Sequence, residues 1–533
     1  MTEKKTAGQQ TAAVLMLQGT ASDVGKSVVT AALCRIFKQD GYRPAPFKSQ
    51  NMALNSYVTA DGKEIGRAQG VQAEASGIEA TTDMNPILIK PVRDMHSQIV
   101  VHGVPYAHMS AADYRNRFLP EARQTVMDAL DRLRNRYDIV VMEGAGSPAE
   151  INLKQRDIVN MNLAGWADAP VLLVADIDRG GVFASLVGTI ELLEPHEVKR
   201  IKGFIINKFR GDLSLLQPGL DWLEERTGIP VLGVLPYVPD IKIEAEDSVV
   251  LDKLPKSRAQ GKELDIAVIR YPRISNFTDV DALAEEPDVS IRFVTEPGQL
   301  GVPDAIILPG TKDTIGDLEM LKAQGIHEDI RIAMEKGSSQ LVGICGGYQM
   351  LGGRLLDPDA VEAGQPQEAE GLGWLPLITT FLKEKQTVRV SGTLAPANPL
   401  PLAGLTEAFP VTGYEIHMGI TERMEGQDDL LPLFSVSRGD GVPFDEGSAA
   451  ADGRVWGTYL HGVFDNDRLR RSWLDGIRLS KGLSPLGQTF AAREAKEREF
   501  DRIADLVRAH LDMKRVYSIM GLTEEMGLPS KEN

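Results

Sequence analysis

Cysteine is scarce in this sequence: Cys34 and Cys345 are the only two among 533 residues. This scarcity excludes a disulfide-stapled fold and favours a reducing compartment, which we expect to be the cytoplasm. We also expect no secretory signal, because residues 1–10 are polar. No apolar run reaches the roughly 20 residues that a membrane-spanning helix needs, so we expect no membrane association.

Excess positive charge is absent too. The chain carries 58 Lys and Arg residues against 75 Asp and Glu residues, a formal net charge of −17. This balance argues against a nucleic-acid surface, although local groups can still bind an anionic small molecule. Hydrophobic residues make up 43% and charged residues 25% of the chain, as in ordinary globular proteins. The composition therefore indicates an ordinary globular protein, and it leaves the oligomeric state open.

A glycine loop stands near the start of the chain. An apolar run at 12–18 predicts a buried strand, residues 19–27 read GTASDVGKS, and a helical pattern follows to about residue 40. In such a unit the loop amides and the helix N-terminus bind phosphate oxygens, the lysine reaches the terminal phosphates, and the final hydroxyl binds Mg2+. The common form of this loop has its first glycine one position later, where this chain has a threonine. The predicted nucleotide-binding residues of the loop are Gly19, Thr20, Asp23, Gly25, Lys26 and Ser27, with Ser27 also a metal ligand.

Two further strand ends carry groups suited to phosphoryl transfer. Lys48 closes a short strand pattern at 42–48, where its ammonium would contact a transferred phosphoryl group; a solvated surface lysine is the alternative. Glu143 closes the apolar run at 137–143, and Gly144 and Gly146 after it leave the approach open. A carboxylate facing a phosphate loop is the usual second protein contact to Mg2+, so Glu143 is the predicted metal ligand beside Ser27.

Apolar strand patterns alternate with helical patterns through the rest of the first half. This alternation predicts a parallel sheet covered by helices on both faces. One of these strands ends in Asn207 and Lys208, a pair suited to recognising the edge of a purine.

The second half contains a candidate nucleophile at Cys345. The apolar run 341–344 predicts a buried strand, Gly346 and Gly347 follow the cysteine, and a short helical pattern begins there. A strand–turn–helix elbow exposes the side chain at its apex and directs helix amides toward it, which favours the reactive thiolate. A small buried cysteine in a tight turn is the alternative.

A base and an oxyanion site are predicted in the same half. His461 ends the strand pattern at 454–461, and a histidine there suits proton transfer with the thiol. Gly310 lies in a strand-end turn, PGT, whose amide can donate to an oxyanion. The predicted oxyanion amides are those of Gly310 and Gly346.

The pattern divides the chain into four parts. We predict a nucleotide-binding synthetase domain at 1–250, a polar linker at 251–263, an α/β domain at 264–480 and a helical C-terminal tail at 481–533.

These motifs together resemble a known fusion. The first half is similar to dethiobiotin-synthetase-like P-loop ATPases, through the loop at 19–27, Lys48 and the sequence EGAG at 143–146. The second half resembles a class I, triad-type glutamine amidotransferase, through PGT, GICGGYQ and YLHG. Their order resembles the family of cobyrinic acid a,c-diamide synthases and cobyric acid synthases. Three further stretches, at 47–56, 176–185 and 413–419, resemble the cobyric acid synthase branch.

The resemblance implies an enzyme with two α/β domains and an amidoligase reaction in cobalamin biosynthesis. Glutamine would be hydrolysed at Cys345, and ATP with Mg2+ would activate a corrinoid carboxylate toward the released ammonia. For the cobyric acid synthase branch it implies four amidations of adenosylcobyrinic acid a,c-diamide, at side chains b, d, e and g.

One position departs from the amidotransferase pattern. Most class I enzymes have a glutamate two residues after the histidine, where this chain has Val463. The family commonly lacks that glutamate, so we expect a Cys345–His461 dyad, with Asp465 a weak candidate to orient the imidazole.

Three alternatives stay open. The first is the a,c-diamide synthase, which performs the same chemistry on other side chains. The second is a ParA-like or MinD-like regulatory ATPase with an inactive amidotransferase module, which the intact Cys345 and His461 oppose. The third is a ligase that amidates a cell-wall or lipid carboxylate, which the corrinoid-type stretches disfavour.

Overall fold

The computed structural model describes residues 11–93, 96–243, 256–362, 365–404, 409–426, 429–439 and 441–522. The chain forms two compact units. The first comprises Met1–Ala53, Glu64–Glu244 and Lys496–Asn533, and the second comprises Leu54–Lys63 and Ala245–Ala495. Residues 244–255, which include the start of the predicted linker, lie outside the described part of the chain, as do residues 523–533 of the predicted tail.

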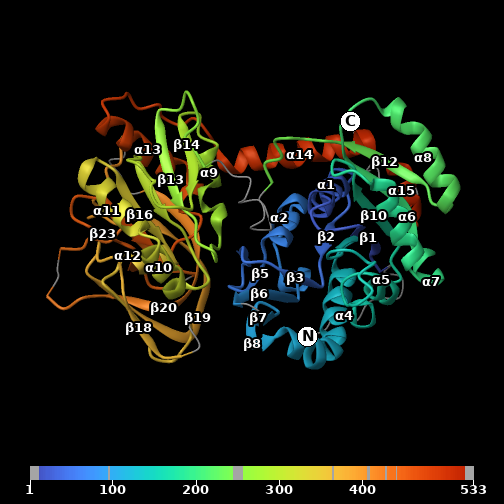
Figure 1. The fold of residues 1–533 in the computed structure, drawn as a ribbon, viewed down its shortest axis with the longest axis horizontal. Helices are drawn as coiled ribbons and strands as arrows, with labels where there is room; N and C mark the ends of the chain where they lie inside the picture. The colour runs from blue at the N-terminus through green and yellow to red at the C-terminus, as the bar shows by residue number, and fades with distance from the viewer. Residues whose placement is uncertain are drawn as a thin grey trace. The chain divides into compact units, whose positions relative to one another are not determined.

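A parallel six-stranded sheet forms the centre of the first unit, in the order β12-β11-β10-β1-β9-β2. Its strands are β1 (Ala13–Gly19), β2 (Pro44–Phe47), β9 (Ile139–Glu143), β10 (Val171–Asp176), β11 (Ile201–Phe209) and β12 (Val231–Pro236). These strands read as nearly continuous apolar runs because helices cover both faces of such a sheet. The prediction of a covered parallel sheet is confirmed (Figure 1).

The remaining elements of the first unit surround this sheet. A smaller sheet has the order β3-β6-β7-β8, with β3 (Gln50–Met52), β6 (Ile87–Arg93), β7 (His96–Val101) and β8 (Val104–Ser110). The short strand β5 is Glu64–Gly66. The helices are α1 (Lys26–Gln39), α2 (Arg67–Ser76), α3 (Ala111–Asp113), α4 (Leu119–Arg136), α5 (Met161–Ala167), α6 (Val182–Leu192), α7 (Pro195–Val198) and α8 (Leu213–Thr227).

The C-terminal helices α14 (Ala492–His510) and α15 (Met513–Ile519) pack against this first unit rather than forming a separate tail. The Arg35 guanidinium donates to Asp501 at 2.7 Å, and the rings of Phe37 and Tyr517 lie 5.6 Å apart. Leu511 bridges to Gly233 on the edge strand β12. The segment after α14 therefore covers backbone groups that an edge strand would otherwise expose.

The second unit is built on the sheet β14-β13-β15-β16-β24-β23. The strands are β13 (Leu264–Ile269), β14 (Val289–Val294), β15 (Ala305–Leu308), β16 (Gln340–Ile344), β23 (Ser448–Ala449) and β24 (Val455–Thr458), all parallel except β23. A second sheet contains β17 (Arg354–Asp357), β18 (Gln367–Glu370), β19 (Leu377–Leu394), β20 (Pro410–Arg423), β21 (Phe434–Arg438) and β22 (Phe444–Glu446). The helices are α9 (Asp281–Ala284), α10 (Thr314–Ala323), α11 (Ile326–Lys336), α12 (Gly346–Leu351) and α13 (Asp467–Ser480).

A short piece of the N-terminal sequence also belongs to the second unit. Residues 54–63, with strand β4 (Ser56–Val58), interrupt the first unit in sequence. The Ser56 amide donates to Asn276 Oδ1 at 3.0 Å, and Arg389 Nε donates to the Val58 carbonyl at 2.9 Å. The unit boundaries thus differ from the predicted ones at this segment and at the C-terminal helices, in both cases because contacts between residues hundreds of positions apart decide the packing.

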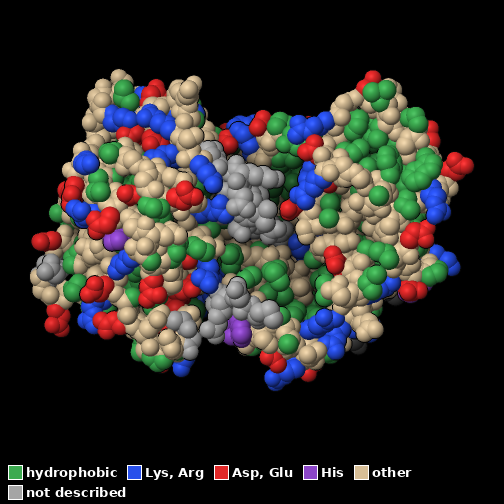
Figure 2. Space-filling view, in the orientation of Figure 1, with side chains coloured by type: hydrophobic (Ala, Val, Ile, Leu, Met, Phe, Trp, Pro, Cys, Tyr) green, Lys and Arg blue, Asp and Glu red, His purple; other side chains and the backbone are tan. Residues whose placement is uncertain are grey.

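Exposed apolar side chains gather over α6 and α8, as Figure 2 shows, and include Leu192, Leu213, Leu215 and Trp222. Within the described part of the chain, no helix combines the length and apolar character needed to cross a membrane.

Candidate active sites

The glycine loop contains two residues with a left-handed backbone. Gly25 has φ +100° and Asp23 has φ +57°. A Cβ on Gly19 would lie 2.6 Å from Val24 and 2.8 Å from Lys26 Nζ. The loop therefore needs glycine at both ends, and it leads directly into the N-terminus of α1, where backbone N–H groups attract anions.

Four predicted side chains meet at the end of β1 and β9. Ser27 Oγ donates to Glu143 Oε1 at 2.8 Å, and Lys48 Nζ donates to the same oxygen at 3.2 Å. Lys26 Nζ donates to the carbonyls of Ala21, at 2.9 Å, and Gly146, at 3.3 Å. The structure thus brings the predicted phosphate-binding lysines and the predicted Mg2+ ligands into one cluster.

Glu143 is kept ionised although it is buried. Burial opposes its negative charge, but the Lys48 ammonium and hydrogen bonds from Gln72 and Ser27 outweigh this and hold the pKa of the carboxyl below its ordinary value. Gln72 Nε2 donates to Glu143 Oε2 at 2.7 Å. The sequence prediction missed Gln72, which lies on α2 and has no local pattern that would link it to β9.

The cluster fits a nucleotide with Mg2+. A hydroxyl and a carboxylate are hard oxygen ligands, and Mg2+ usually takes only one or two of these from the protein, with the rest from phosphates and water. Open space surrounds Gly146, Gly180 and Gly181, where an added Cβ would meet no atom within 4 Å. Among the described residues no group of three or more His, Cys, Asp and Glu is arranged to hold a metal on its own.

Asn207 and Lys208 donate hydrogen bonds to carbonyl groups of the glycine loop. Asn207 Nδ2 donates to the Val24 carbonyl at 2.8 Å. Lys208 Nζ donates to the Asp23 carbonyl at 2.6 Å and to Asp176 Oδ2 at 2.7 Å. Their predicted contact with a purine stays a prediction, and the contacts in the structure give them a role in shaping the loop.

Cys345 stands at the apex of the predicted elbow between β16 and α12. Its backbone has φ +52° and ψ −110°, a strained conformation for a residue with a side chain. Its amide donates to the Thr458 carbonyl of β24 at 2.8 Å. A Cβ on Gly347 would lie 1.9 Å from the Leu308 carbonyl, so only glycine lets the elbow approach β15. This geometry presents the thiol at the carboxyl end of the sheet.

His461 and Asp279 complete a triad with this thiol. His461 Nδ1 lies 2.7 Å from Asp279 Oδ2, and both side chains are buried. Burial disfavours the imidazolium, but the Asp279 carboxylate and the Cys345 thiolate outweigh it and raise the pKa of His461 to about 10. The contribution of Cys345 to this rise reflects a thiol beside the imidazole. The site therefore stabilises the protonated imidazole that forms when a histidine takes the proton of a thiol.

Asp279 was not predicted from the sequence. It lies in the 3-10 turn Phe277–Val280 after β13, and the Gly462 amide donates to its Oδ1 at 2.9 Å. The expectation of a dyad is thus corrected: a carboxylate orients the imidazole, and it comes from residue 279 rather than from 463 or 465. An acid in the loop that follows β13, a strand of the same parallel sheet, is the one signal that would have suggested it.

The predicted oxyanion residues lie around the elbow. A Cβ on Gly346 would be 3.1 Å from the Thr311 amide nitrogen, and one on Gly310 would be 3.3 Å from His461 Cε1. The backbones of these two glycines therefore flank the triad closely, as amides that stabilise an oxyanion must.

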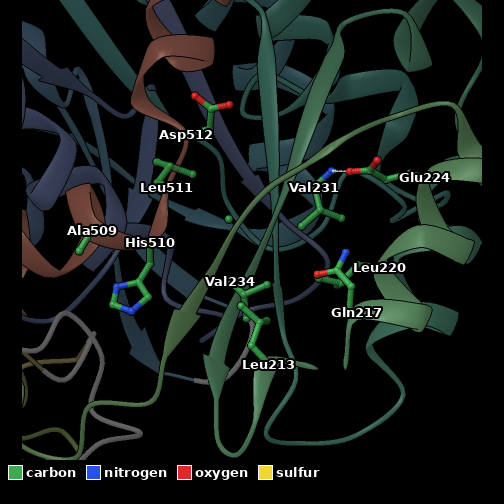
Figure 3. Close-up of a pocket in the computed structure, with 11 residues that line it drawn as sticks. Leu213, Gln217, Leu220, Glu224, Val231, Val234, Ala509, His510, Leu511 and Asp512 are labelled. Carbon is green, nitrogen blue, oxygen red and sulfur yellow. Dashed lines mark hydrogen bonds between the residues drawn. The ribbon is translucent and has the colours of Figure 1, made fainter. Parts of the chain in front are cut away.

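A separate cavity of about 450 Å3 lies in the first unit between α8, β12 and the segment 509–512. Figure 3 shows Leu220, Val234 and Leu511 around it, with Glu224 bonded to the Val231 amide. Its lining contains none of the predicted site residues, so the cavity is not part of either cluster.

Comparison with known proteins gives matches over both halves. Residues 15–250 match the CobQ/CobB/MinD/ParA nucleotide binding domain, and residues 265–469 match the CobB/CobQ-like glutamine amidotransferase domain. The cobyric acid synthase of Desulforamulus reducens is 54% identical over 516 residues, which cover 96% of this chain and 99% of the relative. Those of Geobacillus kaustophilus and Dehalococcoides mccartyi are 51% and 52% identical, covering 95% and 96% of this chain and 97% and 99% of the relatives.

Proposed function

The chain belongs to the cobyric acid synthase family, and from this premise we propose that it amidates carboxylates b, d, e and g of adenosylcobyrinic acid a,c-diamide, using ATP and the amide nitrogen of glutamine. The observation that carries the proposal is identity above 50% over nearly the whole of this chain and of its relatives. Nothing in the comparisons favours the a,c-diamide synthase or a regulatory ATPase.

Glutamine hydrolysis is assigned to the Cys345 site. The thiolate attacks the side-chain amide carbon of glutamine, and the amides of Gly310 and Gly346 stabilise the oxyanion. His461 receives the thiol proton and passes it to the departing ammonia, while Asp279 holds the imidazole in position. Water then releases glutamate from the thioester, with His461 as the base.

Carboxylate activation is assigned to the glycine-loop site. A carboxylate is a poor acyl donor, so its oxygen must first become a leaving group. Attack of the corrinoid carboxylate on the γ-phosphate of ATP gives an acyl phosphate, which ammonia converts to the carboxamide with release of phosphate. Lys26 and Lys48 stabilise the charge on the transferred phosphoryl group. Ser27 and Glu143 would hold Mg2+, which would supply positive charge to the phosphate groups when bound.

Four similar carboxylates on one macrocycle imply a permissive binding surface. A pocket shaped for one orientation would amidate one position only. We therefore expect partly amidated products to leave the enzyme and bind again in another orientation. Samples quenched early should contain free partial amides, whereas their complete absence would contradict this model of binding.

Mass spectrometry of the corrinoid product tests the proposed function. The enzyme is incubated with ATP, Mg2+, cobyrinic acid a,c-diamide and glutamine labelled with nitrogen-15 at the amide. Incorporation of four labelled nitrogens is expected, and Cys345→Ala should require ammonium chloride in place of glutamine. Failure to use the a,c-diamide, with conversion of unamidated cobyrinic acid instead, would favour the a,c-diamide synthase.

A further inference from the structure

The side chain of Asn276 links the segment 54–63 to His461. Asn276 is 4% exposed and has φ +51°, a left-handed conformation that asparagine tolerates better than most residues. Its Oδ1 accepts the Ser56 backbone N–H at 3.0 Å, and its Nδ2 lies 3.4 Å from His461 Nε2. All three residues belong to the second unit.

The Ser56 bond decides which way the Asn276 carboxamide points. A backbone N–H is only a donor, so the carboxamide atom facing it must be the oxygen. The carboxamide nitrogen, also only a donor, is then directed at His461 Nε2. A donor is favourable beside Nε2 when that nitrogen carries a lone pair, and unfavourable when it carries a proton.

This orientation opposes the reactive state of the thiol. When His461 takes the proton of Cys345, Nε2 becomes protonated and faces the Asn276 N–H groups. If the Ser56 bond is broken, the carboxamide can turn and offer its oxygen to Nε2–H instead. The same side chain then stabilises the imidazolium rather than the neutral ring.

We propose that Asn276, oriented by the Ser56 amide, is a positioning residue that restrains the Cys345–His461 pair, and that displacement of residues 54–63 releases it. The inference rests on the proposed glutaminase role of this pair. Residues 54–63 also connect through the chain to Lys48, which precedes Ser56 by eight positions. Seven residues therefore separate Ser56 from Lys48, which directly follows β2.

Among the described side chains around His461 named here, Asn276 is the group that opposes protonation of Nε2. Asp279 Oδ2 lies 2.7 Å from Nδ1, and Tyr414 on β20 stacks on the ring with centroids 5.1 Å apart. Asp279 and Cys345 both raise the pKa of the imidazole.

The pH dependence of Cys345 alkylation by iodoacetamide, followed by intact mass, tests the proposal in the full-length protein. Asn276→Gly suits the left-handed backbone and removes the opposing donor. Ser56→Pro removes the backbone N–H at the first residue of a strand, where proline is tolerated, whereas Ser56→Ala keeps the N–H and is its matched control. We expect the midpoint of alkylation to fall by about half to one pH unit in Asn276→Gly and Ser56→Pro, and to stay unchanged in Ser56→Ala.

The direction in which the alkylation midpoint shifts distinguishes an Asn276 that restrains the Cys345–His461 pair from one that only supports His461. If Asn276 only supported His461, its removal would slow alkylation and move the midpoint upward, which would overturn the proposal, as would an unchanged midpoint in Asn276→Gly. Glutaminase kcat/KM below the wild-type midpoint should rise about 3- to 10-fold without ATP or corrinoid. Amidation of the corrinoid with ammonium chloride, measured in parallel, reports on the proposed function independently of this thiol.

Discussion

Replacement of Asp279 by Asn should nearly abolish glutamine hydrolysis while leaving the synthetase reaction intact. The Gly462 amide donates to Asp279 Oδ1, so the oxygen of the new carboxamide must stay there and its NH2 group must face His461 Nδ1. Neutral His461 would then carry its proton on Nε2, and could no longer accept the proton of Cys345.

The size of the loss follows from the His461 environment. The pKa of this imidazole rises from 6.5 to about 10 under the influence of Asp279 and Cys345, against the opposing effect of burial. That rise corresponds to about 5 kcal/mol between the two protonation states, and Asp279 contributes to it through both its charge and its hydrogen bond, so loss of the carboxylate should strongly disfavour the imidazolium. The wrong tautomer adds to this, and the same exchange in serine protease triads costs about 10^4. We therefore expect glutaminase kcat/KM to fall by about 10^2- to 10^4-fold.

Glutamate release from glutamine measures this effect, and amidation with ammonium chloride serves as the internal reference. Asp445→Asn, at an exposed acid on β22, is the matched control. Loss of the carboxylate lowers the pKa of His461, so the imidazolium is lost at lower pH and the acid limb of Cys345 alkylation moves to higher pH. Glutaminase activity close to wild type, with an unshifted alkylation profile, would refute the assignment of Asp279.

Three further outcomes are expected. Glu143→Gln should reduce ATP-dependent amidation by roughly 100-fold or more, even with ammonium chloride as the nitrogen donor, and should weaken the response of this reaction to Mg2+, while glutaminase activity persists. Amidation equal to that of the wild type at all Mg2+ concentrations would exclude Glu143 as a metal ligand. Burial raises the pKa of Cys34 to about 12. Iodoacetamide at neutral pH should therefore add one adduct to the native wild type, at Cys345, and none to Cys345→Ala. Reaction at Cys34 would contradict its burial. Gly233→Ala would place a Cβ 2.2 Å from the His510 carbonyl oxygen. It should therefore lower the unfolding free energy of the first unit by about 1–3 kcal/mol and speed proteolysis around residue 511. Resistance to proteolysis equal to that of the wild type would show that the C-terminal segment can shift to accommodate the methyl group.

The residues that could be predicted are those with a local pattern. The loop at 19–27, Glu143 and the Cys345 elbow each combine an apolar strand with glycines at its carboxyl end, so the short stretch itself indicates the geometry. Parallel strands bring such ends to one edge of a sheet, which is why Lys48 and Ser27 both reach Glu143.

Residues that act across the fold had no such pattern. Asp279 meets His461 from 182 positions away in the sequence, and Ser56 meets Asn276 from 220 positions away. Nothing in the composition of the turn at 277–280 separates it from an ordinary surface turn. Its role depends on the register of β13 against β15 and of β15 against β16, which only tertiary packing determines.

The attachment of α14 and α15 to the first unit has a consequence for biosynthesis of the chain. During translation, the central strands of this unit leave the ribosome long before the helices that cover α1 and the edge of β12. Residues 245–495 of the second unit are made in the interval, and domains generally fold as units during synthesis. The β12 edge of the nascent nucleotide-binding unit is therefore uncovered until the C-terminal helices have been made. A chaperone that shields this edge would raise the yield of the full-length protein more than the yield of the amidotransferase unit expressed alone.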